Sequence, residues 1–109
     1  MLKNVKKFSP LTEASYYVLL SLAHPLHGYG VLKKVEQMSN GRVKLAAGTL
    51  YGSLSALLDN KLIRSMGEDG ENKRRKLYQM TDLGRDLIRY ETGRLREMVD
   101  NGVREIGEL

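Results

Sequence analysis

Four consecutive cationic side chains form the densest group in this sequence with a capacity for chemistry. They are Lys73, Arg74, Arg75 and Lys76, and they follow the turn-rich residues 67–72. Guanidinium and ammonium groups at this density suit the phosphates of a nucleic acid. A charge run can instead serve solubility alone. Short apolar segments at 62–63 and 77–80 predict a hairpin with this run at its tip, which favours phosphate contact.

A second candidate group lies on a helix predicted to end at Asn60-Lys61, just before the hairpin. Four leucines recur at the spacing of one helical face: Leu50, Leu54, Leu57 and Leu58. The opposite face is small and nearly uncharged, with Gly48, Thr49, Gly52, Ser55 and Asp59. Such a face lets another molecule approach the backbone closely. The candidate contact residues on this helix are Gly48, Thr49, Tyr51, Gly52, Ser53 and Ser55, with the hydroxyls available to phosphate.

Two further helices are predicted upstream to position this one. Ser9-Pro10 suits the first turn of a helix that runs to about Ala23. A second helix over 28–38 buries apolar residues and places Lys33 and Lys34 on or near its outer face. We expect residues 1–9 to form a mobile arm and residues 42–45 to form a short third strand beside the hairpin.

The order helix, strand, basic tip and strand predicts a winged helix-turn-helix within a mainly α (α+β) fold. In this fold the last helix before the hairpin enters a DNA groove, and the helix preceding it crosses the phosphate backbone, where Lys33 and Lys34 can contact phosphates. The predicted reader helix has no Arg, Asn or Gln on its outer face. Specificity is therefore expected to rest on apolar contacts, water and DNA shape.

The charge distribution agrees with a polyanionic partner for the first part of the chain. The formal net charge is +5, and residues 1–81 carry 13 Lys and Arg against 6 Asp and Glu. Residues 82–109 carry 5 Arg against 7 Asp and Glu. This asymmetry predicts a DNA-binding domain over 1–81 and a different task for 82–109, within one continuous globular unit.

No arrangement typical of an enzyme or of a metal or cofactor site is recognisable in the sequence. Its two histidines, His24 and His27, lie in one turn without a nearby cysteine or carboxylate to complete a metal site. They are expected to satisfy backbone groups instead. The absence of cysteine is compatible with the cytoplasm, and no segment has the length or apolar character of a membrane span. We therefore expect a cytoplasmic protein that is not an enzyme.

The C-terminal residues predict one long helix that begins at a Thr81 cap. Apolar residues recur every three or four positions as far as Ile106, and 25 helical residues span about 37 Å. A domain of this size covers only part of that length, so the outer half needs a partner, for which a second copy of the chain is the natural choice. The expected dimer interface comprises Leu95, Met98, Val99, Val103 and Ile106. Gly93 and Gly102 mark either a bend or a close helix–helix contact.

Three motifs together resemble the PadR family of bacterial transcription regulators. They are HGYG at 27–30, GTLYGSLSALLDNKLI at 48–63 and NKRRKLYQMTDLGR at 72–85. Departures are Ala47 and Gly52, where the family often has proline, and Lys61, where glycine is usual. The short tail resembles the smaller subfamily, which has a single C-terminal helix. This resemblance implies a homodimer, and several such proteins respond to small aromatic or drug-like ligands.

We therefore expect a homodimeric transcriptional regulator, a repressor of an inverted-repeat operator in double-stranded DNA, with a small aromatic effector. Its pocket is expected to be lined by Ala14, Tyr17, Val18, Leu95, Met98 and Val99. A filled dimer core without a pocket is the alternative at that place. The competing function is a winged-helix protein–protein interaction module with no specific DNA target.

Overall fold

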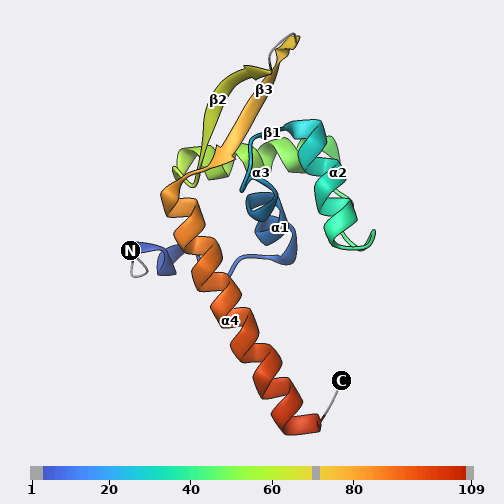
Figure 1. Cartoon of the computed structure of the whole chain (residues 1–109), viewed down its shortest axis with the longest axis vertical. Coiled ribbons are helices and arrows are strands. Elements are labelled where there is room, and N and C mark those ends of the chain that lie inside the picture. Colours follow the sequence, from blue (N-terminus) through green and yellow to red (C-terminus); the bar gives the residue numbers. More distant parts are fainter. Residues whose placement is uncertain (1–3, 70–71, 108–109) are drawn as a thin grey trace.

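A long C-terminal helix extends from a small body of three helices and a narrow sheet (Figure 1). The computed structural model describes residues 4–69 and 72–107, with the side chains of 68–75 outside the description. In chain order the elements are η2 (Lys6–Phe8), α1 (Glu13–Ser21), β1 (Leu26–His27), α2 (Gly28–Met38), α3 (Ala47–Asp59), β2 (Ile63–Asp69), β3 (Asn72–Met80) and α4 (Asp82–Ile106). The predicted mainly α winged-helix fold is confirmed.

Side-chain caps set the starts of three helices. Thr12, His27 and Thr81 accept hydrogen bonds from the backbone N–H groups of Ser15, Gly30 and Gly84, at 3.1, 3.2 and 3.1 Å. Each cap satisfies an N–H group that has no partner within its helix. The predicted Thr81 cap and the backbone role of His27 are therefore confirmed.

The predicted start of the first helix at Ser9-Pro10 is wrong, because α1 begins at Glu13 after the Thr12 cap. The hydroxyl of Ser9 instead donates to the carboxylate of Glu91 on α4, at 2.7 Å. The predicted mobile arm is also wrong for residues 4–9. Val5 is fully buried, and the 3₁₀ helix η2 packs against α4 because Val5 and Phe8 have apolar surface to cover.

The sheet has the order β1-β3-β2, and its third strand is not the predicted one. Leu26 and His27 pair with Tyr78 and Leu77 of β3. Residues 42–45 form no strand, because the Val43 N–H group bonds to the Ser39 hydroxyl at 2.9 Å and this segment turns toward α3.

The hairpin strands are longer than expected. β2 reaches Asp69 and β3 begins at Asn72, with a register shift between Ser65 and Gly67. Part of the stretch predicted as a turn-rich tip is therefore strand, and Gly70 and Glu71 lie outside the described residues. The cationic run belongs to β3 and lies along the distal part of the hairpin.

The core lies where the leucine face of α3 meets α1, α2, the hairpin base and the first turns of α4. Its fully buried members include Leu19, Leu22, Leu50, Leu54 and Leu87. At the hairpin base, the Thr81 N–H group donates to the Leu62 carbonyl at 3.0 Å, and Gly84 packs against the same carbonyl oxygen. These contacts hold together the hairpin of β2 and β3, which forms the wing, the end of α3 and the start of α4. Across the described residues, no helix is long and apolar enough to cross a membrane.

Candidate nucleic-acid interface

The outer face of α3 is open and nearly free of large side chains. Leu50, Leu54 and Leu57 point into the core. On the other side Gly48, Thr49, Gly52 and Ser55 are all exposed, and Cβ atoms added at the two glycines would meet nothing within 4 Å. No side chain caps the helix at Ala46. The backbone of α3 is therefore accessible to a large partner, as predicted from the sequence.

Tyr51 leans from α3 onto the first turn of α2. Its side chain is 51% exposed, but its hydroxyl would lie 2.7 Å from a Cβ added at Gly28. The neighbouring Tyr78 on β3 is 8% exposed, and burial together with Tyr51 raises its pKa. Tyr51 therefore links α3 to α2, a packing role that sequence reasoning missed. Ser53 is only half-exposed, at the edge of the open face.

The hairpin carries its positive charge at both ends. Lys76 is exposed, whereas Lys73, Arg74 and Arg75 are strand residues whose side chains lie outside the description. At the base, Arg64 is exposed and its guanidinium donates to the Gln79 side chain at 3.4 Å. Arg64 was not predicted as a contact residue. The alternation of side-chain direction along a strand could have indicated it, because Ile63 is buried and the next residue must then face outward.

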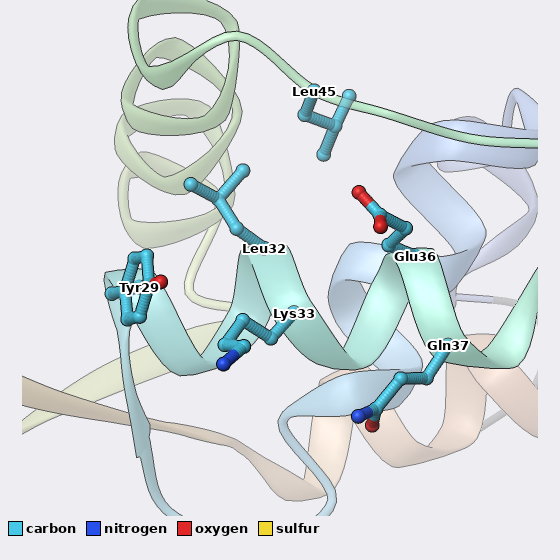
Figure 2. A pocket seen from close by; sticks show the side chains of 6 residues that line it. All are labelled: Tyr29, Leu32, Lys33, Glu36, Gln37 and Leu45. Atoms are coloured by element: carbon cyan, nitrogen blue, oxygen red, sulfur yellow. The ribbon is translucent and has the colours of Figure 1, made fainter. Parts of the chain in front are cut away.

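A hollow of about 340 Å³ lies between α2 and the segment leading to α3. Figure 2 shows Leu32 and Glu36 pointing from α2 toward the segment that carries Leu45. The Lys33 ammonium lies 5.4 Å from the centre of the Tyr29 ring, a cation–π contact that holds it on the exposed side of α2. Lys34 is half-buried, so the two lysines are not equivalent.

An exposed ion pair joins the segment before α3 to α1. Arg42 donates from Nε to Glu13 at 2.8 Å, and a second guanidinium nitrogen bonds to the same carboxylate oxygen. The hydrogen bond from Arg42 lowers the pKa of Glu13, and the carboxylate raises the pKa of Arg42. No local spacing rule predicts this pair, because 29 residues separate its partners.

A buried carboxylate ties the start of the chain to the middle of α4. The Glu91 side chain is fully buried and accepts from the Ser9 hydroxyl, the Leu11 N–H group and Arg94 Nε at 2.7, 2.5 and 2.7 Å. These hydrogen bonds, that from Arg94 foremost, outweigh burial and lower the pKa of Glu91 to about 2. Among the described residues, no three His, Cys, Asp or Glu side chains gather closely enough to hold a metal.

Beyond Glu91 the face of α4 that enters the core continues outward as an apolar stripe. The expected interface residues Leu95, Met98, Val99, Val103 and Ile106 are 36–76% exposed in the single chain. α4 runs through Gly93 and Gly102 without a break. At about 100° per residue, Gly102 lies within the stripe and Gly93 lies opposite it.

The expected ligand pocket is only partly assembled in one chain. A hollow of about 260 Å³ between α1 and α4 is lined by Leu11, Thr12, Glu13, Tyr16, Tyr17, Arg94 and Leu95. Tyr17 and Leu95 were expected there. Val18, which was also expected there, is buried in the core and does not line this hollow. Ala14 is half-buried and outside this lining, and Met98 and Val99 lie farther along α4.

The three helices, the sheet and the basic hairpin define a winged helix-turn-helix protein. Residues 18–90 match the model of the transcriptional regulator PadR-like family, and the chain belongs to this family. The family is described as one of transcriptional regulators.

The chain is also similar to individual proteins. A 37.1 kDa protein in transposon TN4556 of Streptomyces fradiae, described as uncharacterized, is 39% identical over 80 residues, which cover 72% of this chain. The chain spans 22% of that relative's length. A PadR family regulator from Eggerthella lenta superposes with a TM-score of 0.68 at 27% identity, covering 83% of this chain and 78% of the other.

A third similar protein is BpsR of Bordetella bronchiseptica, whose structure concerns regulation of DNA binding by 6-hydroxynicotinic acid. It superposes with a TM-score of 0.70 at 20% identity, covering 92% of this chain and 66% of that protein. At this identity the match speaks for the shared fold.

Proposed function

We propose that this protein is a cytoplasmic, homodimeric repressor that binds an inverted repeat in double-stranded DNA. The observation that carries the proposal is the open face of α3 at Gly48, Thr49, Gly52 and Ser55 beside a hairpin rich in cations. A helix with this face can enter the major groove while the hairpin and Lys33 contact phosphates on either side. A dimer bound across a promoter represses by excluding the polymerase.

The stripe on α4 supports the dimer. Its apolar side chains continue the face that α4 buries against the body, and they are exposed to water in the single chain. Burying them against a partner is therefore favourable. A two-fold pair of α4 helices would cover the stripe, with Gly102 allowing close approach, and would place two α3 helices for inverted half-sites about one helical turn apart. In this proposal residues 1–81 bind DNA and residues 82–109 form the dimer.

A small aromatic effector is the proposed release signal. The hollow between α1 and α4 has two tyrosines on one wall and Leu95 on the other. It lies between the body that carries α3 and α4, the helix that carries the proposed dimer contact. A ligand bound there can therefore favour one distance between the two α3 helices of the dimer over another. The Bordetella neighbour, whose DNA binding is regulated by 6-hydroxynicotinic acid, gives a precedent on the same fold.

Sedimentation of the full chain at micromolar concentration and selection from random duplex DNA test the proposal together. A dimer and an enriched inverted repeat are expected. Val99→Glu should give a monomer with weak operator binding, whereas Glu97→Lys, an exposed position on the opposite side of α4, should leave the dimer intact. A wild-type monomer would contradict the dimer, and a folded dimer that enriches no duplex would favour the protein-binding alternative.

A further inference from the structure

The chemistry of the α3 surface limits which base features it can read. Its exposed side chains from 46 to 59 are alanines, hydroxyl residues and one carboxylate: Ala46, Ala47, Thr49, Tyr51, Ser55, Ala56 and Asp59. Guanine is commonly read by Arg or Lys, and adenine by Asn or Gln, through paired hydrogen bonds. None of these four residue types occurs on α3. The helix therefore lacks the donors for paired readout of either purine.

The polar groups that α3 does carry are poorly suited to replace them. The Tyr51 hydroxyl is drawn against Gly28 of α2. Asp59 is the last residue of the helix, about 15 Å along the axis from Thr49, whereas reader helices contact bases mainly with their N-terminal residues. Single hydroxyls such as that of Ser55 accept or donate to several bases and discriminate weakly.

What remains at the N-terminal half of α3 is a small apolar surface around Gly48, Thr49 and Gly52. The glycines leave open space in which the helix can approach the floor of the groove. The major groove presents one apolar group, the C5-methyl of thymine, and small side chains such as Ala and the methyl of Thr suit it. At one helical turn from Gly52, Thr49 is the exposed residue here that carries a methyl beyond its β-carbon.

We infer that α3 recognises A·T pairs through thymine methyl groups, with Thr49 as the principal contact. The inference rests on the proposed function and names the feature of DNA that the same face reads. Guanine in the half-sites is then not read through its N7 acceptor by this helix. Cations at Lys33, Lys76 and elsewhere bind phosphate and add affinity without sequence preference.

The test begins with the duplex enriched by the full-length protein. Each half-site thymine is replaced in turn by deoxyuracil, which removes only the C5-methyl. One buried methyl corresponds to about a fourfold loss of affinity. We expect at least one such loss in each half-site, unchanged affinity after the same replacement outside the footprint, and less than twofold loss when half-site guanine is replaced by 7-deazaguanine.

Two protein variants assign the contact. Thr49→Ser keeps the hydroxyl and removes the methyl, so its affinity should change by less than twofold on deoxyuracil replacement at the sensitive position. Ser55→Ala, on the same face, should keep the full sensitivity. Wild-type binding that ignores every deoxyuracil, or equal sensitivity in Thr49→Ser and wild type, would overturn the inference while leaving DNA binding intact. Failure to enrich any duplex would overturn it together with the proposed function.

Discussion

Replacing Glu91 with glutamine tests how the start of the chain is fastened to α4. The folded chain lowers the pKa of this carboxyl from 4.5 to about 2 through hydrogen bonds from Arg94, Leu11 and Ser9. That difference corresponds to about 3 kcal/mol of stability at neutral pH. Because the folded-state pKa is the lower one, the contribution is complete above pH 4.5 and is lost as the pH falls toward 2.

Urea unfolding, followed by circular dichroism at one protomer concentration, measures this contribution. The free energy of unfolding of Glu91→Gln should be lower than that of wild type by about 3 kcal/mol at pH 7, and by about 1 kcal/mol at pH 3. Glu97→Gln, an exposed position on the same helix, should stay within about 0.5 kcal/mol of wild type at both pH values. A Glu91→Gln deficit that is the same at pH 7 and pH 3 would refute the reasoning.

Two glycine substitutions test the packing around the wing and the reader. Gly84→Ala brings a Cβ into the Leu62 carbonyl oxygen and should lower stability by about 1–3 kcal/mol, whereas Gly93→Ala, in open space on the same helix, should raise it by about 0.5–1 kcal/mol; equal melting temperatures would contradict this. Gly28→Ala should push the flexible Tyr51 ring aside and so loosen the link between α3 and α2. Operator affinity should then fall several-fold in a titration while the melting temperature stays nearly constant. Unchanged affinity would contradict the linking role of Tyr51.

The helices were predictable where their signals are local. The leucine period of α3, the Thr81 cap and the apolar recurrence along α4 each lie within one stretch of chain, and the structure confirms all three. The start of α1 was not predictable, because Ser9 and Thr12 are both residues that favour a helix N-cap. The choice between them depends on Glu91, 82 residues beyond Ser9, which engages the Ser9 hydroxyl.

Strand pairing and the site were less predictable because they too depend on residues that are far apart in the sequence. β1 has only two residues, too few to show an alternating pattern, and it is a strand because Leu26 meets Tyr78. The outer face of α3 follows from the helical period alone. The placement of Arg42 against Glu13 and of Tyr51 against Gly28 depends on how α1, α2 and α3 pack, which local patterns do not specify.

The salt dependence of duplex binding tests most directly whether the hairpin contacts DNA phosphates beside α3. In a fluorescence anisotropy titration with the enriched duplex, Arg74→Ala/Arg75→Ala should bind more weakly than wild type, with a salt slope shallower by about 0.9 for each phosphate that the variant no longer neutralises. Arg89→Ala/Arg104→Ala removes the same charge from exposed positions on α4 and should leave the slope unchanged. Unchanged affinity and slope in the hairpin variant would contradict a DNA-contacting wing.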